Sequence, residues 1–110
     1  MVHNVVKGAL VFSLILTIGH YTYAHLVMGN NPMELLAGII ILAIGTAMIF
    51  MARQDMVSKG ILGLSVVVLI IHYIYAHILQ GNNPPELLLA IIILIPTVGL
   101  VITKEINFKK

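Results

Sequence analysis

Apolar residues fill four long segments of the chain, at residues 5–28, 32–51, 60–79 and 85–103. A helix needs about 20 mostly apolar residues to cross the hydrocarbon core of a bilayer, and each segment is long enough to do so. The four segments and their minimal connections account for nearly all of the chain. The pattern therefore predicts an all-α membrane protein with four transmembrane helices.

The second half of the chain repeats the first. At an offset of 52 residues, 21 of 45 positions are identical between residues 7–51 and 59–103. The match is densest where HYTYAHLVMGNNPMELL aligns with HYIYAHILQGNNPPELL, with 12 of 17 positions identical. Since each copy contains two spans, the copies have the same orientation, and a pseudo-twofold axis along the membrane normal is expected. The sequence thus predicts two tandem two-helix hairpins, residues 1–56 and 57–110, that form one membrane domain.

Composition and charge support a lipid environment. The chain is 60% hydrophobic and only 9% charged, and its mean hydropathy is +1.08. The basic residues are too few to indicate a nucleic-acid partner, and the absence of cysteine excludes iron–sulfur clusters and thiolate metal sites. All six basic residues lie near the termini or in the central connection, at Lys7, Arg53, Lys59, Lys104, Lys109 and Lys110. The positive-inside rule predicts a cell-membrane protein with both termini cytoplasmic and both GNNP turns outside.

The GNNP turns have a structural explanation. A glycine just past a helix end takes up positive φ without a Cβ penalty. An asparagine N-cap, a proline at the first helical position and a glutamate three residues after the cap form a capping-box pattern. The predicted turn residues are Gly29, Asn31, Pro32, Gly81, Asn83 and Pro84, and the predicted glutamates are Glu34 and Glu86.

Four histidines lie inside the predicted spans, where ionisable side chains are costly and by default face the bundle interior. His20 and His25 are five residues apart, about 140° around a helix, so they do not chelate one ion. The same spacing separates His72 from His77. Counted back from Gly29, His20 lies about 13 Å below the outer helix end and His25 about one turn below it. His20 and His72 are therefore predicted to be the deep pair.

Several roles remain open for the deep pair. Each imidazole could be neutral and bonded to a backbone carbonyl, to Ser13, to Thr17 or to a tyrosine in the packed interior. Alternatively, His20 and His72 could be the two axial ligands of a haem, since four-helix bundles hold cofactors between facing helices. A proton relay, or a contact with lipid or quinone, is a third possibility.

The outer pair, His25 and His77, has two interpretations. Each is four residues from a tyrosine on the same helix face and could be an interfacial residue in a tyrosine belt. They could also bind zinc or copper together with Glu34 and Glu86, because imidazole and carboxylate suit these metals. For the glutamates, helix capping is the alternative. His3 and a free amino terminus could chelate copper(II), although the ordinary mobility of chain ends disfavours a site there.

The second and fourth apolar segments favour close packing of helices over a transport function. Gly38 and Gly45 are seven residues apart and would permit close helix contact. The aliphatic runs at residues 39–42 and 91–94 leave no polar face, so lipid or other membrane subunits are expected around the helices and no channel lining is evident.

Two HYxYAH…GNNPxELL hairpins in about 110 isoleucine-rich residues resemble the small X subunit of the ammonia monooxygenase of ammonia-oxidising archaea. The resemblance implies an accessory subunit in a hetero-oligomeric, copper-dependent membrane complex that oxidises ammonia to hydroxylamine, with the copper site on other subunits. It implies no catalytic residue in this chain. The alternatives are a membrane redox protein that binds haem or copper through its paired histidines, and a small oligomeric transporter.

Overall fold

The computed structural model describes residues 2–27, 29, 33–79, 81 and 85–104. They form four helices: α1 (Val2–Leu26), α2 (Met33–Phe50), α3 (Met56–Leu79) and α4 (Pro85–Thr103). The described residues contain no strand, and all four helices are long and apolar enough to cross a membrane. The predicted all-α fold with four membrane-spanning helices is confirmed.

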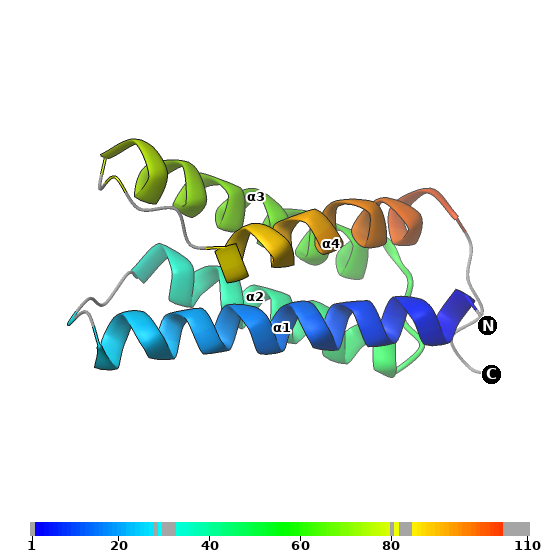
Figure 1. Cartoon of the computed structure of the whole chain (residues 1–110). Coiled ribbons are helices and arrows are strands. Elements are labelled where there is room, and N and C mark those ends of the chain that lie inside the picture. The colour runs from blue at the N-terminus through cyan, green and yellow to red at the C-terminus, as the bar shows by residue number, and fades with distance from the viewer. Residues whose placement is uncertain (1, 28, 30–32, 80, 82–84, 105–110) are drawn as a thin grey trace.

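The helices run side by side in a bundle of about 42 × 21 × 19 Å (Figure 1). The most extensive contacts are those of α2 with α3 and of α1 with α4, and the contacts within each hairpin are smaller. The pairs α1 with α3 and α2 with α4 lie diagonally across the bundle. The main packing interfaces therefore join one hairpin to the other.

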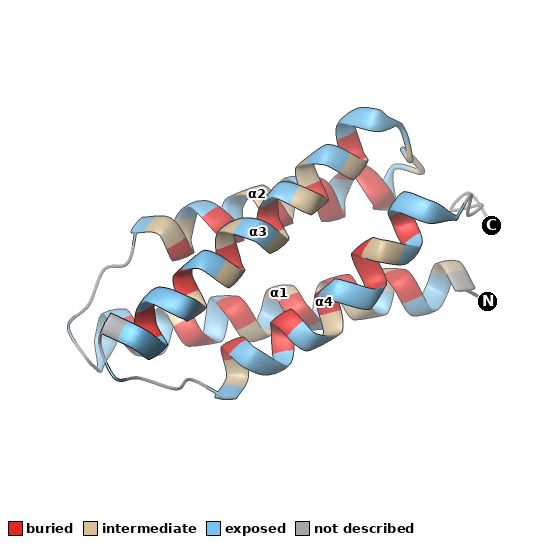
Figure 2. Ribbon diagram, turned by 90° about the horizontal axis from the view of Figure 1, so that it is seen from above, coloured by how far each residue is buried: buried red, intermediate tan, exposed pale blue. Residues whose placement is uncertain are grey.

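One stripe of each helix is buried. On α1 the buried positions alternate in steps of four and three residues, which keeps them on one helix face, and on α3 the buried positions lie 52 residues later. Figure 2 shows these stripes turned toward the neighbouring helices. The residues are Val6, Leu10, Ser13, Thr17, His20 and Ala24 on α1, and Ser58, Leu62, Ser65, Leu69, His72 and Ala76 on α3.

Glycines bring α2 close to α3. A Cβ atom built on Gly45 would lie 2.6 Å from Leu62 Cδ2, and one built on Gly38 would lie 3.0 Å from Leu69 Cδ2. Lipid tails are as apolar as leucine, so close van der Waals packing is a main source of attraction between membrane helices. The predicted close contact at Gly38 and Gly45 is confirmed, with α3 as the partner.

At one end of the bundle, the central connection stops α2 with a left-handed residue. Ala52 has a φ of 62°. The N–H of Arg53 donates to the carbonyl of Met48 (2.9 Å), and the N–H of Ala52 donates to that of Ile49 (2.9 Å). This is the Schellman arrangement, in which glycine is the usual left-handed residue. An alanine in its place carries a steric cost.

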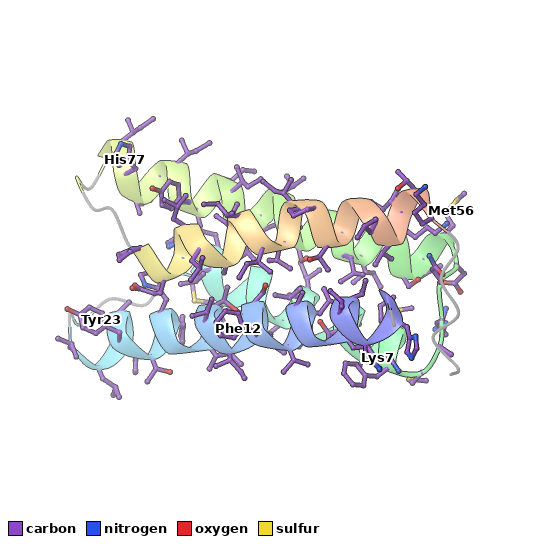
Figure 3. All side chains as sticks on the ribbon, turned by 45° about the vertical axis from the view of Figure 1, so that its right-hand side comes forward. Lys7, Phe12, Tyr23, Met56 and His77 are labelled. Atoms are coloured by element: carbon purple, nitrogen blue, oxygen red, sulfur yellow. The ribbon has the colours of Figure 1, made fainter. Side chains whose placement is uncertain are left out.

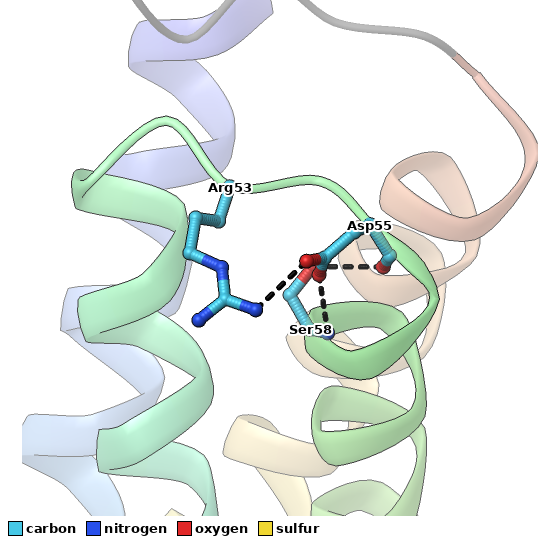
Figure 4. Close-up of polar contacts among 3 residues, drawn as sticks. All are labelled: Arg53, Asp55 and Ser58. Atoms are coloured by element: carbon cyan, nitrogen blue, oxygen red, sulfur yellow. Dashed lines mark hydrogen bonds and ion pairs between the residues drawn. The ribbon is translucent and has the colours of Figure 1, made fainter.

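The same connection caps two other helices. Asp55 accepts a hydrogen bond from the Ser58 N–H (3.0 Å), which makes it the N-cap of α3, and it pairs with Arg53 at 2.7 Å (Figure 4). The Arg53 guanidinium and then the Ser58 N–H lower the pKa of Asp55 from its usual 3.8 to about 2. Gln54 Nε2 donates to the carbonyls of Val101 (2.8 Å) and Lys104 at the end of α4. The connection thereby ties α2, α3 and α4 together.

The opposite end carries the two glycine turns. Gly29 and Gly81 both have a φ of +67°, as predicted for a glycine just past a helix end. The predicted caps Asn31, Pro32, Asn83 and Pro84 lie outside the described residues. Figure 3 shows Tyr23 and His77 at this end, and Lys7 and Met56 at the other. Lys7 Nζ lies 5.3 Å from the ring centroid of Phe50.

Candidate functional site

Two histidine–glutamate pairs cross between the hairpins. His20 Nδ1 on α1 lies 2.6 Å from Glu86 Oε1 on α4, and His72 Nδ1 on α3 lies 2.8 Å from Glu34 Oε1 on α2. Each pair joins a residue of one hairpin to a residue of the other, in a reciprocal arrangement. We call these four residues the His–Glu cluster.

The histidines of the cluster are its interior part. His20 is 8% exposed and His72 is 4% exposed, whereas the glutamate side chains are 38% (Glu86) and 43% (Glu34) exposed. The two imidazole rings have centroids 6.4 Å apart and planes inclined at 55°. The cluster therefore crosses the bundle as carboxylate, imidazole, imidazole and carboxylate.

Helix length places the cluster near the glycine-turn end of the shorter helices. Glu86 is the second residue of α4, which has 19 residues, while His20 lies six residues before the end of α1, which has 25. At about 1.5 Å per residue, α1 continues roughly 9 Å past His20. The depth of His20 predicted from the sequence was counted from the end of α1, the helix that carries it. Measured against α4, His20 lies beside the first helical turn.

The outer histidines, His25 and His77, are exposed and stack on tyrosines of their own helices. The ring centroids of Tyr21 and His25 are 6.1 Å apart with an interplanar angle of 2°, and those of Tyr73 and His77 have the same values. The i, i+4 spacing predicted that such pairs share a face, and the structure confirms this contact.

The predicted zinc or copper set of His25, His77, Glu34 and Glu86 is not assembled. Both carboxylates bond to the inner histidines instead. Within the described residues, no group of three or more histidine, aspartate or glutamate side chains is arranged to hold a metal ion. The physical reason is the unequal helix length, because the first turns of α2 and α4 meet α3 and α1 below the level of His77 and His25.

Hydroxyl groups make up the rest of the polar interior. Thr17 Oγ1 donates to the carbonyl of Leu14 (2.9 Å), and Ser65 Oγ donates to that of Leu62 (2.6 Å). Ser13 Oγ and Thr46 Oγ1 are buried and have no hydrogen-bond partner among the described residues. Ser13 and Thr17 were among the partners that the sequence suggested for His20 and His72. In the structure, the glutamates are the bonded partners.

The contact between histidine and glutamate was missed because capping explained the glutamates on its own. One signal was present in the sequence. A buried imidazole in lipid requires a polar partner, and Glu34 and Glu86 are the acidic residues that fall within the four apolar segments.

Comparisons with protein-family models, with curated protein sequences and with solved structures give no match to this chain.

Proposed function

We propose that this chain is an accessory, structural subunit of a multi-subunit membrane complex and supplies no catalytic residue itself. The observation that carries the proposal is that aliphatic side chains cover the outside of the bundle, while polar contacts lie between its two hairpins. Many of the exposed side chains along all four helices are large aliphatic groups, among them Ile15, Ile44, Val67 and Ile95. Two polar contacts between helices, the His–Glu pairs, join one hairpin to the other.

Such a surface suits contact with lipid and with other membrane proteins. Membrane helices associate through close packing, without a hydrophobic driving force between them, so an aliphatic surface of fixed shape is a suitable partner face. The His–Glu pairs and the capped central connection would keep that shape constant. We further propose that the complex resembles archaeal ammonia monooxygenase and that this chain takes the place of its X subunit, with copper held by larger subunits.

Co-purification tests the accessory role. A tagged chain extracted from its native membranes in mild detergent should bring larger integral-membrane subunits with it in fixed stoichiometry. A second tagged membrane protein of similar size, extracted in the same way, controls for non-specific carry-over. Recovery of the chain alone, with detergent conditions that keep other membrane complexes intact, would contradict the proposal.

The proposed orientation has the termini and central connection in the cytoplasm and the glycine turns outside. It rests on the distribution of the basic residues. The chain has no cysteine, so single cysteines at Val27 and Met56, which are 67% and 86% exposed, report each end without background. A membrane-impermeant maleimide should label V27C in intact cells and M56C only after permeabilisation. The reverse pattern would contradict this orientation.

A further inference from the structure

The imidazoles of the His–Glu cluster have the environment of metal ligands. In metal sites, the ligating histidine almost always donates its second ring N–H to a carboxylate, a carbonyl or water, which fixes the tautomer and the ring orientation. Both His20 and His72 have this bond from Nδ1 to a glutamate. A neutral ring that donates from Nδ1 keeps its Nε2 lone pair for a metal ion. Nε2 is the second ring nitrogen and is not the atom bonded to the glutamate, so it is the atom available to a metal ion.

The separation of the rings permits one ion between them. A metal ion lies about 2.0–2.1 Å from an imidazole nitrogen, so one ion joins two rings whose centroids are roughly 5 Å apart in tetrahedral geometry and roughly 6 Å apart when the nitrogens are opposite each other. The observed distance is 6.4 Å. The two rings lie at the outer limit of this range, so a side-chain rotation must bring both Nε2 atoms toward the ion.

The charge of the cluster is also compatible with a divalent ion. A charge buried in a membrane requires compensation. Two neutral imidazoles, two ionised carboxylates and one divalent ion have no net charge. The carboxylates are partly exposed while the imidazoles are buried, so the polar shell lies on the outside and the ligands lie within.

We propose that His20 and His72 together bind one divalent transition-metal ion, zinc or copper(II), through their Nε2 atoms, with Glu86 and Glu34 as the residues that position the two rings. Water molecules would complete the coordination. This site is independent of the accessory function proposed above. The subunit could assemble without it, and metal binding would not by itself identify a partner.

The test uses the intact chain in detergent with His3→Gln throughout, because His3 and a free amino terminus would otherwise bind copper(II). Zinc binding is measured by calorimetry, and copper(II) is studied by electron paramagnetic resonance. We expect one zinc ion per chain and coupling of copper to two imidazole nitrogens. His20→Asn and His72→Asn should each abolish stoichiometric zinc binding and leave one coupled nitrogen. The double variant His25→Asn with His77→Asn is the matched control and should bind as the parent does.

A second variant keeps the test decisive if the histidine variants fail to fold. The double variant Glu34→Gln with Glu86→Gln retains the shape of both side chains. We expect it to weaken zinc binding by about 10–100-fold, as loss of such positioning groups does, and to leave the helical circular dichroism unchanged. The proposal is overturned if the parent binds no zinc, if binding survives loss of His20 and His72, or if the outer pair proves to hold the ion. A Soret band from the purified protein would assign the histidines to haem instead and would also overturn it.

Discussion

The contact of Gly45 with α3 provides the sharpest test of the packing. The site of a Cβ on Gly45 is 2.6 Å from Leu62 Cδ2, 2.9 Å from Leu62 Cγ and 3.3 Å from Ile61 Cγ2. Leu62 is fully buried, and its Cγ is too close as well as its terminal methyl, so a simple rotation of the leucine does not make room. Gly45→Ala should therefore push α2 away from α3.

The magnitude follows from two opposing effects. Overpacking by one methyl group in a close-packed core costs about 1–3 kcal/mol. Alanine in place of glycine in a helix returns up to roughly 1 kcal/mol through backbone entropy. We expect a net loss of about 1–2 kcal/mol in the free energy of unfolding. Leu62→Ala removes the obstructing branch, so in that background the same substitution should be neutral or stabilising.

The assay is unfolding by sodium dodecyl sulfate in mixed micelles, followed by tyrosine fluorescence and circular dichroism. Gly19→Ala is the matched control, since Gly19 also lies within a helix and no atom lies within 4 Å of the site of its Cβ. It should leave the stability unchanged or raise it. If Gly45→Ala and Gly19→Ala differ by less than about 0.5 kcal/mol, or if Leu62→Ala fails to relieve the loss, the close contact between α2 and α3 is wrong.

Three further predictions concern the central connection. Ala52→Gly should raise the free energy of unfolding by about 1 kcal/mol, because the left-handed conformation at a φ of 62° costs alanine about 1–2 kcal/mol, and denaturation in micelles measures it. Gln54→Ala should cost about 0.5–1.5 kcal/mol through the lost bonds to the end of α4, and faster amide exchange at Lys104 would locate the loss. Asp55 has a lower pKa folded (about 2) than its usual 3.8, so its stabilising effect is complete above about pH 4 and is lost as the pH falls toward 2. Asp55→Asn should flatten the acid limb of the stability curve in that window, and an unchanged limb would refute the role of the Arg53 pair.

The sequence predicted what depends on local chemistry and on the solvent. Four apolar segments of sufficient length form helices in lipid, because a helix satisfies its backbone hydrogen bonds within one segment, whereas a barrel needs neighbouring strands. The glycine conformations were predictable for the same local reason, since Gly29 and Gly81 follow helix ends and lack a Cβ atom. Gly38 and Gly45 were recognisable as a close-contact stripe, although the sequence could not name α3 as the partner helix.

Ala52 marks the limit of local signals. Alanine rarely adopts the left-handed conformation, so the residue type did not predict that Ala52 would end the helix in this way. It is held there by the bonds of its neighbours to the last carbonyls of α2 and by the cap that starts α3 at once.

The His–Glu cluster was decided by tertiary structure alone. Because the hairpin is duplicated, each histidine could pair with either of two glutamates. The spacing of residues within one helix does not predict which helices are neighbours. That choice follows from the packing of α1 on α4 and of α2 on α3. The level at which the groups meet follows from helix length, because α1 and α3 extend past the first turns of α4 and α2. The sequence therefore determined which side chains were available within the membrane, and the packing of unequal helices determined that His20 meets Glu86 and His72 meets Glu34.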